Sequence, residues 1–246
     1  MNFKSLIFIT LSLVISSETM YAATPQSVCG TEDRLISNER AVGRLRNKKK
    51  GYLFCSATLI GRSCVITAGH CGPVHQVMGF DIEVVENRFR WASKENTFEV
   101  DKESKKYSGG GKGDDWAVFR LKANRKTKLH AGDTRPFLNV QFEPPEIGTQ
   151  IKVIGYGGAE NLYSFSQQEG PGELVGIFPT YVTHTADTKG GSSGAPIIDP
   201  ATNGVFGIHT HGNCKEATNS GTLISGIPEF VEAIRECLDW ESENLD

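Results

Sequence analysis

Short apolar segments, each ended within a few residues by turn residues, recur through most of this chain. Between them there is almost no apolar periodicity of the helical kind. This pattern predicts an all-β fold built from antiparallel barrels or a sandwich. The expected strands are 53–60, 64–67, 76–78, 82–85, 97–100, 117–121, 150–154, 181–185, 195–198, 205–208 and 222–224.

The remaining segments have simpler interpretations. Gly61-Arg62 is typical of a hairpin turn, and the polar, Gly-rich stretch 101–113 is expected to be a surface loop. Pro144-Pro145 is a candidate crossing into a second barrel. One helix is expected from Pro228 onward, because Phe230, Val231, Ile234, Cys237 and Leu238 recur on one face. The polar residues 241–246 are expected to fray.

The N-terminal residues resemble a cleaved secretory signal. Lys4 precedes an apolar run, 6–15, that is too short to span a bilayer, and the small residues Ala22 and Ala23 follow. We therefore expect a signal peptide at 1–23, with 24–27 as a short propeptide if one exists. The mature protein is expected to be secreted or periplasmic, with no membrane contact after signal removal.

The composition limits the classes of binding partner that are expected for this chain. The chain of 246 residues is 38% hydrophobic, enough to bury a full core in one or two domains. Its 26 Lys and Arg against 29 Asp and Glu give a net charge of -3, which does not favour nucleic acid or anionic lipid as a partner. No cofactor is implied, and a monomer is expected.

Six cysteines lie beyond the signal, at positions 29, 55, 64, 71, 214 and 237. An even number in an exported chain favours disulfides, although composition alone leaves their pairing open. A metal cluster of Cys214 with His209 and His211 is the alternative. We do not expect a metal, because no acidic or CxxC partner completes that set.

The segment Gly190–Pro196 places two serines among glycines. A serine hydroxyl becomes a useful nucleophile only beside a base and oxyanion donors, and glycines let backbone N–H groups approach it closely. An ordinary turn would look similar. Two further segments favour a catalytic serine over a simple turn. His70 follows an apolar run and precedes Cys71, and Asp115 begins the run Trp116–Leu121.

These segments, TAGHC, DWAVFRL and GSSGAP in that order, resemble chymotrypsin-like serine endopeptidases. The resemblance implies two six-stranded antiparallel β-barrels with the catalytic residues in the cleft between them, and a C-terminal helix. It implies an N-terminal barrel at 28–140 with His70 and Asp115, and a C-terminal barrel at 141–246 with Ser193. Protein or peptide substrates follow from the same resemblance.

Matched to the family motifs, Ser193 is the nucleophile, His70 the general base and then acid, and Asp115 the group that orients the imidazole. The N–H groups of Gly191 and Ser193 would form the oxyanion hole. Asp114 is a less favoured carboxylate. The family disulfide that brackets the histidine loop corresponds to Cys55 and Cys71.

Two other classes compete with this interpretation. Gly190-x-Ser192-x-Gly194 also spells a nucleophile elbow, which would make Ser192 catalytic in an α/β-hydrolase, with Asp199 and His209 as its partners. That fold needs alternating helices, which the pattern lacks. The second competitor is a non-catalytic, chymotrypsin-like binding protein, in which the same groups are present and do not align.

Specificity is ambiguous in the sequence. Asp187, six residues before Ser193, occupies the position that gives trypsin-like enzymes their preference for Lys or Arg. The strand 205–212 instead resembles that of bacterial glutamyl endopeptidases, whose histidine corresponds to His209 and whose threonine corresponds to Thr188. The segment 30–34 also resembles their N-terminal region. We therefore favour cleavage after Glu or Asp, with both side chains binding the substrate carboxylate.

The chain also departs from the family in two places. Ser192 replaces the aspartate that pairs with a freed amino terminus in animal trypsins, so that route of zymogen activation is not supported. Cys29 stands where the bacterial enzymes have an aliphatic residue. A position close to the specificity pocket would let Cys29 pair with Cys214, which leaves Cys64 to pair with Cys237. A purely structural His209 is the alternative to its role in specificity.

Overall fold

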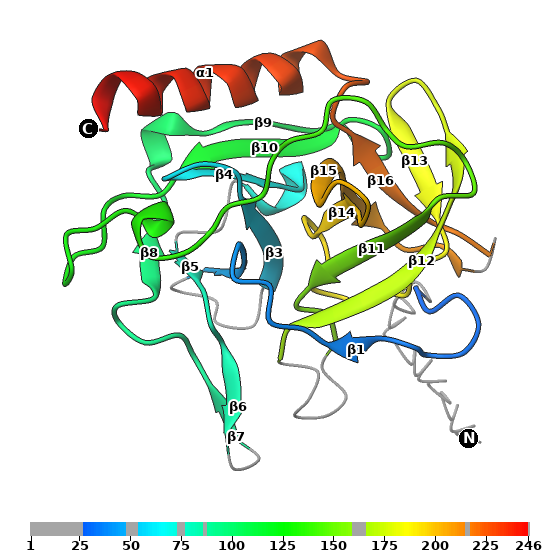
Figure 1. Ribbon diagram of the computed structural model, residues 1–246, viewed down its shortest axis with the longest axis horizontal. Helices are drawn as coiled ribbons and strands as arrows, with labels where there is room; N and C mark the ends of the chain where they lie inside the picture. The colour runs from blue at the N-terminus through cyan, green and yellow to red at the C-terminus, as the bar shows by residue number, and fades with distance from the viewer. Residues whose placement is uncertain are drawn as a thin grey trace, which may run out of the picture.

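The computed structural model describes residues 27–47, 54–72, 77–158 without 86–87, 166–214 and 217–245. The expected signal peptide, 1–23, and most of the proposed propeptide therefore lie outside the described residues. Two β-barrels lie side by side, with one helix across them (Figure 1). In the described part of the chain, no helix is both long and apolar enough to cross a membrane.

The first barrel is a seven-stranded antiparallel sheet in the order β8-β5-β2-β3-β4-β10-β9. A bridge between Val100 and Leu121 joins the chain just after β8 to the chain just after β10. Six strands therefore close, as expected, and β9 is added at one edge. The bounds are β2 (Val42–Arg46), β3 (Phe54–Leu59), β4 (Cys64–Thr67), β5 (Val77–Gly79), β8 (Thr97–Glu99), β9 (Lys106–Gly109) and β10 (Asp115–Arg120).

The second barrel has the order β1-β12-β11-β14-β15-β16-β13, and β12 also pairs with β13. Six strands again close, while β1 is added outside them. A separate hairpin joins β6 (Glu83–Val85) and β7 (Arg88–Arg90). The bounds in the barrel are β1 (Leu35–Ile36), β11 (Gln150–Gly155), β12 (Gln168–Ile177), β13 (Tyr181–His184), β14 (Pro196–Asp199), β15 (Gly204–His211) and β16 (Asn219–Leu223).

Each barrel buries its own apolar face. Leu45, Met78 and Phe98 lie opposite one another on three neighbouring strands of the first barrel and are fully or almost fully buried. Side chains such as Val153 and Phe206 fill the second barrel in the same way. Because strand side chains alternate between faces, these residues also fix which neighbours point outward.

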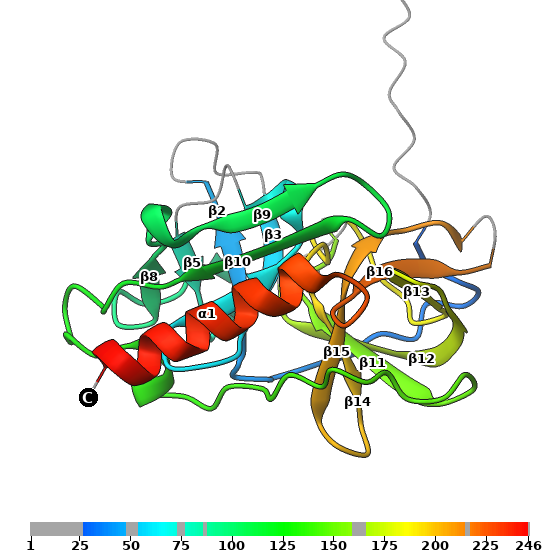
Figure 2. The same cartoon turned by 90° about the horizontal axis from the view of Figure 1, so that it is seen from above.

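Helix α1 (Pro228–Asn244) packs against the first barrel, across β10 and β4 (Figure 2). Its first turn begins with proline, which needs no partner for an N–H group there. Phe230 stacks on Trp116 of β10 with ring centres 5.1 Å apart, and Cys237 forms a disulfide with Cys64 of β4. The helix predicted from the apolar spacing is thus confirmed, with its apolar face on the barrel.

Two local expectations were wrong. Within 101–113, expected to be a loop, the chain forms the short 3-10 helix η2 (Lys102–Ser104) and strand β9. Lys106 and Tyr107 are exposed on this edge strand, so its sequence carries no apolar signal. The helix also continues to Asn244 and does not fray from 241, because Glu241 is buried against the turn before β4.

Strands β2 and β12 lack a simple sequence signal. β2 alternates buried Leu45 with arginines whose stems cover the outer face of the sheet. β12 contains Gly170 and Gly172, which argue against a strand in a propensity count. At Gly172 a β-carbon would lie 2.2 Å from the backbone nitrogen of Ala186, so this strand requires glycine where it passes close to its neighbour.

Glu241 anchors the end of the helix, and this yields a first prediction. Its carboxylate accepts hydrogen bonds from the backbone N–H groups of Arg62, Ser63 and Cys64 and from the Ser63 hydroxyl. Glu241→Gln is expected to lower the free energy of unfolding by about 2 kcal/mol or more, because a buried acceptor is replaced in part by a donor. Denaturant unfolding measures this. Glu243→Gln, on the exposed side, is the control and should change little.

Candidate active site

The imidazole of His70 is held by a buried carboxylate. His70 lies in the 3-10 turn η1 (Gly69–Cys71) after β4, and Asp115 begins β10 beside it. One Asp115 oxygen accepts from the His70 backbone N–H at 2.8 Å, and the other lies 2.7 Å from His70 Nδ1. The Asp115 side chain is 2% exposed and that of His70 46%. The carboxylate therefore holds the Nδ1 edge of the imidazole, and the rest of the ring is partly exposed to solvent.

The loop that carries Ser193 is tied to the first barrel by Ser56 of β3. The Ser56 N–H donates to the Ser193 carbonyl at 2.8 Å, and its hydroxyl donates to the Gly191 carbonyl at 3.0 Å. Gly194 has a φ of +83°, and a β-carbon there would lie 2.0 Å from Thr67 Oγ1. Glycine is required at 194 because the loop presses against the strand that leads to His70.

The peptide before Gly191 has a defined orientation. The Gly190 carbonyl accepts from the Gly158 N–H at 2.8 Å. In a trans peptide the C=O and N–H groups point to opposite sides, so the Gly191 N–H is directed away from Gly158. Gly191 has a φ of +105°, and a β-carbon there would lie 2.4 Å from the Tyr156 carbonyl. Among the described residues, the Gly191 N–H, two residues before Ser193, has no hydrogen-bond acceptor.

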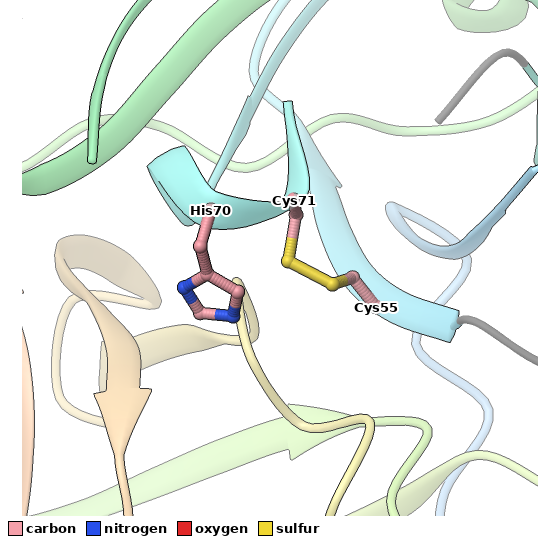
Figure 3. Close-up of side chains that lie close together, drawn as sticks. All are labelled: Cys55, His70 and Cys71. Atoms are coloured by element: carbon pink, nitrogen blue, oxygen red, sulfur yellow. A yellow bond between two sulfur atoms is a disulfide. The ribbon is translucent and has the colours of Figure 1, made fainter. Parts of the chain in front are cut away.

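Figure 3 shows His70 beside the sulfur atoms of Cys55 and Cys71, three groups that could in principle bind a metal ion. The two sulfur atoms are bonded to each other, so neither is available as a thiolate ligand. Cys214, which entered the metal alternative with His209 and His211, is likewise bonded to Cys29. The three disulfides of the structure are the pairs reached in the sequence analysis.

Asp187 is occupied by the N-terminal segment of the described chain. Its two oxygens accept from the backbone N–H groups of Cys29 at 2.6 Å and Asp33 at 3.3 Å. Only 3% of the residue is exposed, and burial raises the pKa of its carboxyl. The Ser27 carbonyl accepts from Thr188 and Asn219 next to it. The segment that begins at Ser27 therefore packs directly against Asp187 and Thr188.

Thr188 and His209, the two residues expected to bind a substrate carboxylate, are both buried. Thr188 is 1% exposed, and within the described residues its hydroxyl has no hydrogen-bond partner. His209 is 3% exposed, and its Nδ1 lies 3.3 Å from Nε2 of the fully buried His184. Burial lowers the pKa of His209 well below its ordinary value and that of His184 to about 4. Both rings are therefore neutral near pH 7.

Sequence reasoning missed several residues that shape this region. Ser56, His184 and Asn219 had no motif around them, and each matters only through contacts between distant segments. His211 was considered only as a metal ligand. It is half-buried with Nδ1 at 2.9 Å from the Thr210 hydroxyl, and burial lowers its pKa. The sequence feature that could have drawn attention to His211 was its position two residues after His209 on the same strand.

The comparisons with known proteins agree with this geometry. The family model for trypsin matches residues 28–234, which is most of the chain. The chain belongs to the trypsin family of serine endopeptidases. Snake venom serine protease PA of Trimeresurus stejnegeri is 25% identical across 93% of this chain and 95% of its own length. Thrombin-like enzyme calobin-1 of Gloydius ussuriensis is 25% identical across 78% and 80%.

Solved structures of this trypsin-family fold are also similar. A Glu endopeptidase in complex with MPD has a TM-score of 0.70 at 20% identity, covering 86% of this chain and 99% of its own. The thermostable serine protease AL20 has a TM-score of 0.61 at 16% identity, covering 84% and 98%. At such identities the likeness establishes the chymotrypsin-like fold of two barrels and a C-terminal helix.

The buried histidine pair makes stability depend on pH. The folded state holds His184 neutral down to about pH 4, while the unfolded chain takes up a proton near pH 6.5. Stability present above pH 6.5 is therefore lost as pH falls toward 4. His184→Gln is expected to reduce the loss between pH 7 and pH 4.5 by more than about 1 kcal/mol. Urea unfolding at both pH values measures this, and an unchanged loss would contradict it.

Proposed function

We propose that this trypsin-family chain is an exported endopeptidase that cleaves peptide bonds through Ser193, His70 and Asp115. The observation that carries the proposal is the pair of hydrogen bonds between Asp115 and His70. Two hydrogen bonds, one to the backbone and one to Nδ1, hold the ring in a single orientation. They direct Nε2 outward as the proton acceptor, which is the arrangement a serine nucleophile needs.

The reaction follows from these groups. Ser193 Oγ attacks the substrate carbonyl carbon while His70 Nε2 takes the hydroxyl proton, and the carbonyl electrons move onto oxygen. Collapse of this intermediate breaks the C–N bond, and the imidazolium gives its proton to the leaving amine. Water then repeats the sequence on the acyl-enzyme and releases Ser193. Asp115 stabilises the imidazolium throughout.

The oxyanion is assigned to the N–H groups of Gly191 and Ser193. The bond from Gly158 to the Gly190 carbonyl supports this, because it turns the next N–H toward the Ser193 side of the loop. The Ser56 contacts to both Gly191 and Ser193 fix the loop before substrate arrives. Donors held in place in this way are typically worth about 10²- to 10³-fold in turnover.

For the residue before the scissile bond we propose glutamate, or aspartate, over lysine or arginine. Asp187 already accepts two backbone N–H groups, which weakens it as a partner for a substrate cation. The buried Thr188 hydroxyl lacks a partner among the described residues, so it is a donor awaiting an acceptor. The similar Glu endopeptidase fold is consistent with this choice.

We assign the charge for that carboxylate to His209. The free ring is neutral because it is buried, and a bound carboxylate would stabilise the imidazolium by a charge-assisted hydrogen bond. Substrate glutamate would therefore bind together with a proton. His184, at 3.3 Å from Nδ1, accepts or donates on the far side and positions the ring.

Export is proposed from two observations. Three disulfides need an oxidising compartment, and the venom proteases that resemble this chain bear names of secreted enzymes. Ser27 contacts Thr188 and Asn219, so we propose that maturation leaves Ser27 in the active chain. Where animal trypsins carry an aspartate that pairs with a new amino terminus, the Ser192 hydroxyl here accepts a hydrogen bond from the Lys189 N–H at 3.3 Å.

The catalytic assignment is tested by exchanging each neighbouring serine. Ser193→Ala is expected to lower kcat by at least about 10⁴-fold and to abolish labelling by a fluorophosphonate probe, because the nucleophile is removed. Ser192→Ala is the matched control and should still be labelled. Labelling that is lost only in Ser192→Ala would indicate the nucleophile elbow, and no labelling of the wild type would indicate a non-catalytic binding protein.

Specificity is tested with two peptides that differ only in Glu or Gln at the cleavage position. The ratio of their kcat/KM values cancels any pH dependence that the two peptides share. It is expected to favour Glu at acidic pH and to fall by up to about tenfold per unit as pH rises, levelling off above the pKa of His209 in the complex. His209→Gln should flatten this ratio. Cleavage restricted to Lys or Arg would support Asp187 as the specificity residue.

A further inference from the structure

A cavity lies on the outer surface of the first barrel, and its lining includes neither His70 nor Ser193. It has a volume of about 510 Å³ and opens over the outer face of β2, β5 and β8. In Figures 1 and 2 β5 and β8 lie on the side of the first barrel that faces away from the second. None of the residues proposed for catalysis or for the specificity pocket lines it.

The floor of this cavity joins an aromatic ring to an arginine. Arg46, Val77 and Glu99 lie opposite one another on three neighbouring strands and share the outer face. The Arg46 guanidinium lies 3.9 Å above the Trp91 ring, and the Trp91 N–H donates to the Thr97 hydroxyl at 3.2 Å. In the described residues, the buried Nε of Arg46 has no hydrogen-bond partner. A stacked guanidinium thus retains an unsatisfied donor.

The rim is strongly basic. Among the lining residues a single acid, Glu99, faces five cations, namely Arg46, Lys94, Lys122, Arg125 and Lys126. This contrasts with the chain as a whole, whose net charge is -3. A concave basic site on an otherwise acidic protein concentrates anions at that place.

Ion pairs neutralise only part of this charge. Arg125 pairs with Glu99 at 2.8 Å, and Lys122 lies 3.8 Å from Asp101. Lys126 pairs with Glu95. For Arg46 and Lys94, by contrast, the described residues supply no ion pair. Partial burial also lowers the pKa of Arg46.

We propose that this cavity is a docking site for an acidic segment of the polypeptide substrate, one that carries an aromatic or large apolar side chain. The apolar side chain lies on Trp91 and Val77, and flanking carboxylates bind Arg46 and Lys94. This inference depends on the proposed endopeptidase function in one respect: that function identifies the bound acidic segment as part of a substrate. Such a site would raise affinity for selected proteins without altering the chemistry at Ser193.

Binding is measured with the Ser193→Ala chain, so that cleavage plays no part. The probe is the fluorescein-labelled peptide Ac-Gly-Asp-Asp-Phe-Asp-Asp-Gly-amide, and its partner has Asn at each Asp. Anisotropy is expected to show binding of the acidic peptide alone. Lys94→Glu is expected to weaken it about fivefold or more by reversing an unpaired charge at the rim. Lys128→Glu, an exposed lysine outside the cavity, should change it less than twofold.

The outcomes separate this inference from the proposed function. Absence of binding, equal binding of both peptides, or no effect of Lys94→Glu would overturn the docking site even if the wild type cleaves peptides normally. Conversely, peptide binding does not depend on whether Ser193 is catalytic. Tighter, Lys94-dependent binding of a heparin tetrasaccharide than of the peptide would replace the acidic peptide by a sulfated glycan, and so overturn the assignment.

Discussion

The contact of Ser56 with the loop 191–193 is the constraint on which the candidate site depends. Ser56 belongs to the first barrel and the loop to the second, yet an N–H and a hydroxyl of one residue bind two carbonyls of that loop. The same hydroxyl accepts a hydrogen bond from the Tyr156 N–H, so the Ser56 hydroxyl both donates and accepts. Because a buried polar group without partners is costly, these bonds strongly favour one relative position of the two barrels.

From this position the rest of the site follows. The Ser56 carbonyl accepts from the Thr67 hydroxyl, on the strand that leads directly into His70. On the other barrel, the Thr222 hydroxyl donates to the carbonyl of Asp115. The segments proposed to carry the nucleophile, the base and the orienting acid are therefore separate in the chain, and hydrogen bonds to backbone groups join them. Rigid support of this kind is what preorganised catalysis requires.

The N-terminal segment has a comparable role at the specificity pocket. A disulfide holds Cys29 against Cys214, and the backbone nitrogens of Cys29 and Asp33 bind Asp187. The acid that suggested cleavage after lysine or arginine is thereby drawn into structural bonding. The buried histidine pair and the Thr188 hydroxyl are the polar groups on which the proposed preference for an acidic side chain depends.

The sequence by itself determined the fold class and the helix, since strand alternation and the apolar spacing from Pro228 depend on local periodicity. It also supplied His70, Asp115 and Ser193 as candidates through short motifs. It did not reveal β12, where Gly172 passes close to Ala186, or the continuation of the helix past Glu241 to Asn244. Those features, like Ser56, His184 and the basic cavity, arise where residues far apart in the chain meet. Local propensity carries no record of such contacts, so only the tertiary structure decided them.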